Sequence, residues 1–243
     1  MSPKPAAILF SDFDGTITLQ DSNDYLTDTL GMGHSTRMGL NEKLKDQSLS
    51  FSEGFYKMLY SIAENGHSFE ECIELLLKNI SLDSGFKETA AWCIQNGIPV
   101  VIVSSGMEPI IKALVHKLVG DELGKHIIFY ANDVQFSDSI KFKDLVENDG
   151  GWRIKYRDTT PFGHDKQQSI DDFVKQIYGD GEKGLLFYCG DGVSDISASK
   201  SCDVLFAKKG LDLVDICQSE GIPCIEFETF SDILSTIKQK LNN

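Results

Sequence analysis

The chain has no long hydrophobic run and few basic residues, and both absences restrict its function. Its apolar runs are far shorter than the roughly 20 residues that a membrane-spanning helix needs, so we expect no membrane partner. The 243 residues include 23 Lys and Arg against 37 Asp and Glu, a formal net charge of −14. Phosphate backbones repel such a chain, which argues against nucleic acid as a partner. A small phosphorylated substrate stays compatible, because a local cation can override the overall field.

The sequence also lacks cysteine pairs and an amino-terminal targeting segment. The six cysteines are Cys72, Cys93, Cys189, Cys202, Cys217 and Cys224. None of them forms a CxxC pair, and residues 1–5 lead directly into a short apolar run rather than a signal peptide. We therefore expect buried free thiols in a reducing compartment, with the cytoplasm as the location.

Strand-like apolar runs alternate with helical patterns over most of the chain. The predicted strands are residues 6–12, 99–104, 126–131, 185–189, 204–207 and 224–227. This alternation predicts an α/β fold with a parallel sheet covered by helices on both faces.

Two segments depart from the alternation. Residues 19–84 contain no strand-like run, and their apolar residues recur at the spacing of amphipathic helices. Residues 131–158 contain two alternating runs around a polar loop, which predicts a β-hairpin appended to the sheet. We therefore expect a core domain of residues 1–18 and 85–243, with residues 19–84 as a helical insert.

The most informative motif is Asp12-Phe13-Asp14-Gly15-Thr16, which follows the first apolar run. Strands are depleted in Asp, and buried charges need partners. Two carboxylates at this spacing make sense if one attacks a substrate and the other transfers a proton. A strand-end turn is the structural alternative.

Three later segments place polar side chains beside the ends of strands or helices. Ser104 and Ser105 end the second predicted strand, and Lys166 precedes a helical pattern. Asp191 and Asp195 follow the fourth predicted strand. Because ligands of open α/β sheets bind beyond the carboxyl ends of the strands, we expect these groups to meet the first motif there. Turn, N-cap and solvent-exposed roles are the alternatives.

This order of acid pair, serine, lysine and acid pair resembles the four motifs of the haloacid dehalogenase superfamily of phosphohydrolases. The resemblance covers nearly the whole chain. It implies a Rossmann-like core with a helical C1 cap inserted after the first strand. It also implies a Mg²⁺-dependent phosphomonoesterase that works through an aspartyl-phosphate. The transport ATPases of the superfamily are excluded, because the chain has no membrane-spanning run.

The resemblance also assigns roles to the first motif. Asp12 is expected to be the nucleophile, and Asp14 the general acid and base. Thr16 is expected to help position Asp14 and to contribute to phosphate binding. The carboxylates and a phosphate dianion together outweigh Mg²⁺ and one lysine, so we expect repulsion to raise the pKa of Asp14.

The later motifs are expected to bind the phosphoryl group. Ser104 and Ser105, with nearby backbone N–H groups, would hold phosphoryl oxygens. Lys166 would neutralise the charge that develops during transfer. Two roles are possible for His164, that of a structural histidine or that of a residue in or behind the substrate site.

The metal is expected to bind oxygen ligands only. The proposed set is Asp191, one oxygen of Asp12 and the backbone carbonyl of Asp14. Asp195 would act through water or from behind these ligands. The same balance of charges predicts that the site fails without metal.

Resemblances to two narrower groups of phosphatases indicate which substrate to expect. The phosphoserine phosphatases use an acidic cap residue, which Asp21 matches, and a cap arginine for the substrate carboxylate. Tyr56 stands where that arginine is expected, and the only arginine of residues 19–84 is Arg37, outside that segment. An aspartate and a tyrosine suit hydroxyl groups better than a carboxylate.

Several local segments look like the fungal polyol phosphatases. They are residues 21–31, 103–107, 161–166 and 188–195. This resemblance implies hydrolysis of sugar-alcohol phosphates such as sorbitol 6-phosphate or ribitol 5-phosphate. The open alternatives are a phosphoserine phosphatase-like enzyme, a broad phosphomonoesterase, a phosphotransferase or mutase, and a non-catalytic binding module. The sequence does not indicate the oligomeric state.

Overall fold

The computed structural model describes residues 4–46, 48–138, 142 and 148–242. Its strands are β1 (Ala7–Ser11), β2 (Val100–Met107), β3 (Ile128–Phe136), β4 (Trp152–Lys155), β5 (Leu185–Gly190), β6 (Val204–Lys208) and β7 (Ile225–Phe227). Its helices are α1 (Ser22–Thr29), α2 (His34–Lys45), α3 (Phe51–Glu64), α4 (Phe69–Asn79), α5 (Phe86–Gln95), α6 (Glu108–Val119), α7 (Asp121–Gly124), α8 (Lys166–Tyr178), α9 (Asp195–Ser199), α10 (Asp212–Glu220) and α11 (Phe230–Leu241). The predicted α/β class is confirmed.

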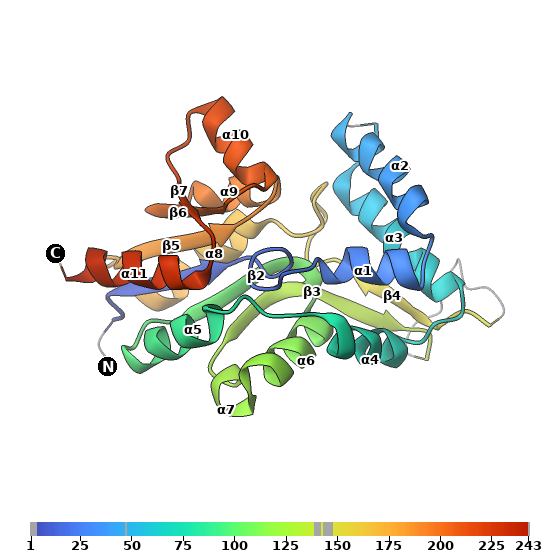
Figure 1. Ribbon diagram of the computed structural model, residues 1–243, viewed down its shortest axis with the longest axis horizontal. Coiled ribbons are helices and arrows are strands. Elements are labelled where there is room, and N and C mark those ends of the chain that lie inside the picture. Colours follow the sequence, from blue (N-terminus) through green and yellow to red (C-terminus); the bar gives the residue numbers. More distant parts are fainter. Residues whose placement is uncertain (1–3, 47, 139–141, 143–147, 243) are drawn as a thin grey trace.

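The strands form one sheet in the order β4-β3-β2-β1-β5-β6-β7. Among the described strands, only the pairing of β3 with β4 is antiparallel. β1 occupies the centre, where Leu9 pairs with Val100 on one side and with Phe187 on the other. The carboxyl ends of β1, β2 and β5 therefore meet at one edge of the sheet (Figure 1).

Side-chain alternation along β1 builds a core on each face of the sheet. Ala7 and Leu9 join a cluster with buried residues of α5, α6 and α11. Ile8 and Phe10 join the opposite cluster, which contains buried residues of α8 and α10. A strand buried on both faces reads as a continuous apolar run, which is the pattern of β1.

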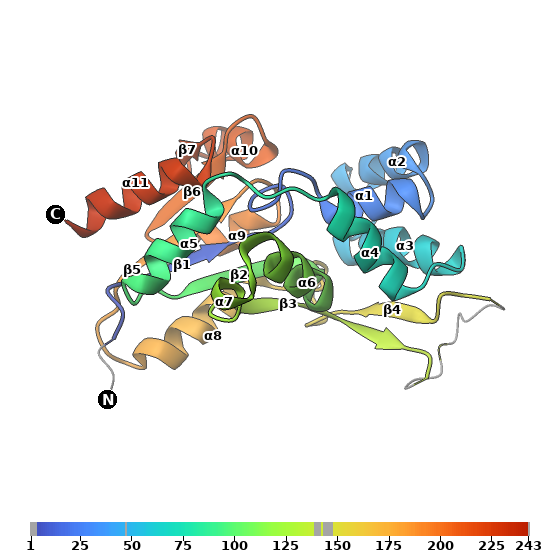
Figure 2. The same cartoon turned by 60° about the horizontal axis from the view of Figure 1, so that its bottom comes forward.

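Helices α1 to α4 form a group beyond the carboxyl end of β1 (Figures 1 and 2). The chain enters and leaves this group side by side, because Thr18 forms an antiparallel bridge with Leu82. The amide of Asp83 also donates to the carbonyl of Ile17 at 2.8 Å. The helical segment is thus joined to the sheet through two adjacent connections.

The predicted hairpin is present, but its first strand is longer than expected. The predicted strand 126–131 and the first hairpin strand are one element, β3, which pairs with β2 at its start and with β4 at its end. Helix α3 packs against β4, and Trp152 of β4 donates its Nε1–H to the carbonyl of His67 at 2.9 Å. The helical segment therefore covers one face of the hairpin (Figure 2). Residues 139–141 and 143–147 of the connecting loop lie outside the described residues.

Within the described residues, no helix is both long enough and apolar enough to cross a membrane.

Candidate active site

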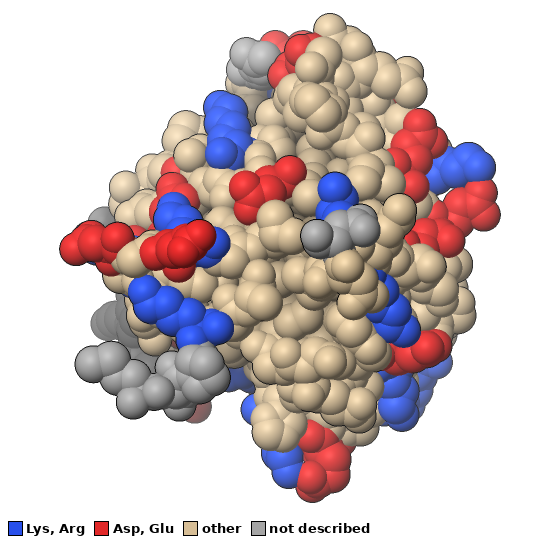
Figure 3. Space-filling model, turned by 90° about the vertical axis from the view of Figure 1, so that its left-hand side faces the viewer, with Lys and Arg blue, Asp and Glu red and all other residues tan. Residues whose placement is uncertain are grey.

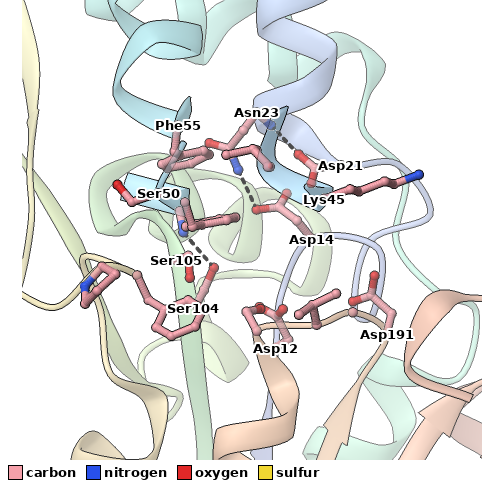
Figure 4. Close-up of a pocket in the computed structure, with 18 of the residues that line it drawn as sticks. Asp12, Asp14, Asp21, Asn23, Lys45, Ser50, Phe55, Ser104, Ser105 and Asp191 are labelled. Carbon is pink, nitrogen blue, oxygen red and sulfur yellow. Dashed lines mark hydrogen bonds between the residues drawn. The ribbon is translucent and has the colours of Figure 1, made fainter. Parts of the chain in front are cut away.

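A pocket of about 870 Å³ lies at the carboxyl edge of the sheet. Its floor consists of residues that follow β1 and β5 and of the end of β2. Its upper wall comes from the helical segment and from the loop before α8, with the rings of Phe51, Phe55 and Phe162. Figure 4 shows Asp12 and Asp191 together on the floor, with Asp14 turned toward Asn23. Both aspartates of the first acid pair and Asp191 of the second thus line one cavity.

Asp12 continues β1 into the pocket, because its amide donates to the carbonyl of Cys189 at 2.8 Å. Its Oδ1 accepts from the amide of Phe13 at 2.6 Å, and its Oδ2 accepts from Nζ of Lys166 at 2.7 Å. Burial raises the pKa of Asp12 to about 7, although the Lys166 ammonium opposes the shift. The carboxylate is therefore fixed in direction and faces the cavity.

Asp14 points away from Asp12 and is held by the start of α1. Its Oδ1 accepts from the amide of Ser22 at 2.8 Å, and its Oδ2 accepts from Nδ2 of Asn23 at 2.9 Å. Burial first, and then the charge of Asp21, raise the pKa of Asp14 well above its usual range. The predicted direction of this shift is confirmed, but desolvation is its main cause. A carboxyl group that keeps its proton near neutral pH can act as a general acid.

Asn23 is a site residue that the sequence reasoning missed. It is buried, lines the pocket and binds the carboxyl of Asp14 directly. It stands in the first turn of α1, where an asparagine is unremarkable. Only the fold of α1 over the sheet edge brings it to Asp14.

The turn after Asp14 fits closely around Asp191. Gly15 adopts a φ of +75°, and a Cβ atom there would lie 2.7 Å from Oδ2 of Asp191. Both features require glycine. Thr16 was expected to position Asp14, and its hydroxyl donates to Oδ1 of Asp191 at 2.6 Å. Thr16 thus orients the carboxylate of the second acid pair.

Lys166 lies 1% exposed between two carboxylates. Besides Asp12, its Nζ contacts Oδ1 of Asp195 at 2.7 Å. Burial alone would lower the pKa of Lys166, but the two carboxylates raise it. The lysine therefore stays charged.

Asp195 is fully buried and accepts several hydrogen bonds. Its Oδ1 also accepts from the hydroxyl of Tyr188 at 2.6 Å, and its Oδ2 accepts from the amides of Asp191 and Gly192 at 2.9 and 3.0 Å. Burial raises the pKa of Asp195, but the Lys166 ammonium and these donors leave it below its usual value. Tyr188 was also missed, because a tyrosine inside a buried strand normally indicates core packing.

The carboxylates form a group that can hold a metal ion. Asp12, Asp191 and Asp195 each place one oxygen within 4.8 Å of the others. Burial first, and then repulsion from the other two, raise the pKa of Asp191 to about 8. One lysine does not balance three carboxylates, and an all-oxygen donor set suits a hard divalent cation. The residues present fit such an ion.

The two serines expected to bind phosphate both line the pocket. The Oγ of Ser104 accepts from the amide of Gly106 at 3.0 Å. Among the described residues, the Oγ of Ser105 is the one buried side-chain polar atom without a hydrogen-bond partner. Burying an unpaired hydroxyl is costly, so this atom is a candidate contact for a bound oxyanion.

Of the two residues of the helical segment that were expected to contact substrate, one lines the pocket and the other does not. Asp21 lines the pocket and caps α1, because its Oδ1 accepts from the amides of Asn23 and Asp24 at 2.8 and 2.9 Å. Tyr56 does not belong to the described pocket lining, and its ring stacks on Tyr60. The structure thus does not place Tyr56 against the described cavity, and its contact with substrate stays a prediction. Successive helical residues point about 100° apart, so α3 presents Phe55 to the cavity instead.

Comparison with solved structures identifies the class of fold. A substrate-bound phosphoserine phosphatase complex superposes with a TM-score of 0.66 at 21% identity, covering 97% of this chain and 99% of that one. The family model for haloacid dehalogenase-like hydrolases matches residues 9–200. The chain belongs to this family and is a phosphatase of it.

Two fungal proteins are similar to the chain over nearly its whole length. Polyol phosphate phosphatase PYP1 of Saccharomyces cerevisiae is 48% identical over 240 residues, covering 97% of this chain and 94% of that protein. Pdp3-interacting factor 1 of Schizosaccharomyces pombe is 46% identical over 233 residues, covering 96% and 95%. The predicted family is thus confirmed.

Proposed function

We propose that this phosphatase hydrolyses small sugar-alcohol phosphates with Mg²⁺ as cofactor. The observation that carries the reaction is the pair of carboxyl groups at the pocket floor, with Asp12 bound to Lys166 and Asp14 bound to Asn23. Similarity to a polyol phosphate phosphatase along the chain supports the substrate class.

The chemistry follows from the different surroundings of the two carboxyl groups. Asp12 attacks phosphorus and forms an acyl phosphate while the ester P–O bond breaks. Asp14 gives its proton to the leaving alkoxide, and then accepts a proton from the water that cleaves the acyl phosphate. Lys166 stabilises negative charge on the phosphoryl oxygens.

Phosphate binding is proposed for the end of β2. The hydroxyls of Ser104 and Ser105 and the turn around them face the cavity. Mg²⁺ bound by Asp12, Asp191 and the carbonyl of Asp14 would offset the negative charge of the phosphate. Asp195 supports this set by holding Lys166 and the amide of Asp191.

We further propose that residues 19–84 act as a cap domain on a core of residues 1–18 and 85–243. The two adjacent connections at Thr18 and Leu82 would let the cap move over the pocket. The cap meets the core again where the amide of Ser52 donates to the carbonyl of Pro161 at 2.9 Å. A pocket closed in this way admits small molecules and excludes a phosphoprotein.

The cellular location of the enzyme is inferred from its cysteines, and the absence of nucleic acid as a partner is inferred from its surface charge. All six cysteines are free, which supports a reducing, cytoplasmic compartment. On the face shown in Figure 3, basic and acidic side chains are interspersed. This mixture and the net charge of −14 support the proposal that nucleic acid is not a partner.

A phosphoserine phosphatase-like activity is the second candidate, favoured by the structural neighbour. Its substrate has a carboxylate, for which a planar, bidentate arginine is the usual partner. Arg37 is buried in ion pairs with Asp24 at 2.6 Å and Asp28 at 2.7 Å, and it does not belong to the described pocket lining. Lys45 is the one basic residue of the described pocket lining, and its ammonium lacks the planar fork of an arginine, which supports hydroxyl groups over a carboxylate as the proposed ligand.

A phosphate-release assay tests the substrate class. The purified enzyme with Mg²⁺ would be given sorbitol 6-phosphate, ribitol 5-phosphate, phosphoserine and p-nitrophenyl phosphate in water without another acceptor. We expect the highest kcat/KM with a polyol phosphate. Faster release from phosphoserine would contradict the proposal. Consumption of the phosphate ester that requires an added alcohol acceptor and releases no inorganic phosphate would indicate a phosphotransferase.

A further inference from the structure

The carbonyl groups of the β2 turn are held by side chains from two other elements. The carbonyl of Ser104 lies 2.7 Å from Nδ1 of His164, in the turn before α8. The carbonyl of Ser105 accepts from Nδ2 of Asn132, in β3, at 2.7 Å. His164 and Asn132 are 2% and 0% exposed. The mechanism described above uses neither side chain.

Regular strand pairing does not reach this turn. The register of β2 with β1 runs from Val100 to Ile102, and its register with β3 is interrupted between Val103 and Met107. Residues 104–106 therefore lie in an irregular stretch. Without a continuous ladder, other contacts must fix the orientation of these peptide groups.

The hydrogen-bonding roles of His164 follow from its two partners. A carbonyl oxygen can only accept, so Nδ1 of His164 must carry the proton. Nε2 accepts a hydrogen bond from the hydroxyl of Ser169 at 2.8 Å. Burial lowers the pKa of His164 to about 4, which agrees with a neutral ring of one tautomer. Both nitrogens are thus committed to protein partners.

Holding a carbonyl also sets the direction of the next N–H group. The peptide bond is planar and trans, so its C=O and N–H point in opposite directions. The His164 contact therefore orients the amide of Ser105, and the Asn132 contact orients the amide of Gly106. Ser105 and Gly106 both line the pocket, and the hydroxyl of Ser105 has no hydrogen-bond partner among the described residues.

We propose that His164 and Asn132 are positioning residues that hold the Ser104–Gly106 turn in its phosphate-binding shape. The inference rests on the proposed role of this turn in phosphate binding. His164 also stands two residues before Lys166, and Oδ1 of Asn132 accepts from the amide of Arg157 at 2.8 Å. One short segment before α8 thereby connects the phosphate turn with the lysine.

Two substitutions of His164 separate positioning from packing. In His164→Asn, the amide Nδ2 can occupy the place of Nδ1 and donate to Ser104. In His164→Gln, the amide lies near Nε2, and that donor is lost. The dissociation constant of inorganic phosphate, measured by calorimetry with Mg²⁺, and the KM for p-nitrophenyl phosphate are compared for both variants.

We expect His164→Gln to raise both constants about tenfold or more, since an unsatisfied buried carbonyl is costly, and His164→Asn to stay within a few fold of the unchanged enzyme. The kcat should change less than KM in both variants. Equal effects of Asn and Gln, or lower thermal stability with unchanged phosphate affinity, would reduce the role of His164 to packing and overturn the inference.

Asn132 provides the second arm of the test. Asn132→Ala should raise the phosphate dissociation constant, and its combination with His164→Gln should be non-additive, because both contacts hold one turn. Asn96→Ala is the matched control, since Asn96 also donates to a backbone carbonyl, that of Trp92, at 2.8 Å in an exposed position. Simple additivity of the pair, or an equal change in the control, would contradict a shared positioning role.

This comparison does not depend on the polyol assignment. A wrong substrate class would appear in the release assay and leave the phosphate constants unchanged. Phosphate affinity unaffected by Ser105→Ala together with Ser104→Ala would instead reject phosphate binding at this turn. The failure of the inference and that of the proposed function are thus distinguishable.

Discussion

Two aspartates that are two residues apart have different surroundings and therefore different chemistry. Asp12 faces Lys166, and Asp14 faces neutral donors from α1. The lysine favours the charged form of Asp12, whereas burial and Asp21 favour the protonated form of Asp14. Two carboxyl groups whose pKa values are shifted by different partners suit the roles of nucleophile and general acid.

The general-acid role of Asp14 predicts a dependence on the leaving group. Asp14→Asn should lower kcat/KM for an alkyl phosphate by roughly 10²-fold or more, the usual contribution of such catalysis. The loss for p-nitrophenyl phosphate should be much smaller, because nitrophenolate leaves without a proton. The two rates are measured on the same preparation with Mg²⁺. Equal losses on both substrates would exclude Asp14 as the proton donor to the leaving group.

The metal-free carboxylates predict how stability depends on pH. The pKa values of Asp12 and Asp191 are raised to about 7 and 8 in the folded protein, so the native state binds protons that the unfolded state releases. Stability from these groups is therefore lost as pH rises from near 4 toward 8. Mg²⁺ replaces those protons and should raise Tm more at pH 8 than at pH 5.5.

Differential scanning fluorimetry with and without Mg²⁺ at both pH values measures this effect. Asp191→Asn removes one of the repelling charges and serves as the comparison, since it should weaken the Mg²⁺ effect at pH 8. A Mg²⁺ shift of Tm that is equal at the two pH values would contradict a metal site built on these carboxylates.

At the scale of elements, the sequence predicted which residues lie at the ends of strands, but not which side chains of a helix face the pocket. Asp12, Lys166 and Asp195 follow or precede strongly patterned segments, so their meeting at the sheet edge follows from parallel topology. The neighbours that the structure gives Tyr56 and Thr16, Tyr60 and Asp191, were not predicted, because they depend on the rotation of α3 and on the position of the loop after β5. No local pattern in the sequence encodes those two quantities.

The strand β3 shows the same limit. Its first half carries the apolar run of a buried parallel strand, and its second half alternates like a hairpin. The change of pattern predicted two elements, whereas the backbone continues through Asn132 without a break. A strand that leaves the core sheet and enters a hairpin changes its surroundings without ending.

Helix α1 connects the proposed substrate-binding residue Asp21 with the protonation state of Asp14. Asp21 caps this helix, lines the pocket and raises the pKa of Asp14. Asp21→Asn keeps a good N-cap residue, whereas Asp21→Ala also removes the cap, at about 1 kcal/mol. The pair of variants therefore separates charge from helix stability.

We expect both changes to lower kcat/KM for a polyol phosphate by roughly tenfold, since one charge-assisted hydrogen bond is lost. Neither should change kcat/KM for p-nitrophenyl phosphate much at neutral pH, because it has no hydroxyls to bind. In Asp21→Asn, the pKa of Asp14 should fall because a nearby negative charge is removed. The basic limb of the pH profile of kcat/KM for the polyol phosphate should therefore move to lower pH. Equal slowing of both substrates would assign Asp21 to site geometry rather than to recognition.

At the scale of the whole molecule, the proposed function assigns the reaction to the edge of the sheet and substrate choice to the helical segment. The edge of the sheet carries the carboxylates and the Ser104–Gly106 turn, and α8 carries the lysine. The helical segment supplies Asp21, Asn23 and the rings of Phe51 and Phe55 (Figure 4). Asn23 crosses this division, because it binds Asp14 from the helical segment. Closure of the segment would therefore complete the surroundings of the general acid as well as cover the substrate.

The central claim is that Asp12 carries the phosphoryl group during turnover. Quenching the enzyme with acid during turnover and reducing it with borohydride converts an aspartyl-phosphate to homoserine, which mass spectrometry locates in the peptide. We predict homoserine at position 12 in the active enzyme, and neither homoserine nor turnover in Asp12→Asn, which should still fold. Homoserine at another aspartate, or substantial activity of Asp12→Asn, would contradict the account.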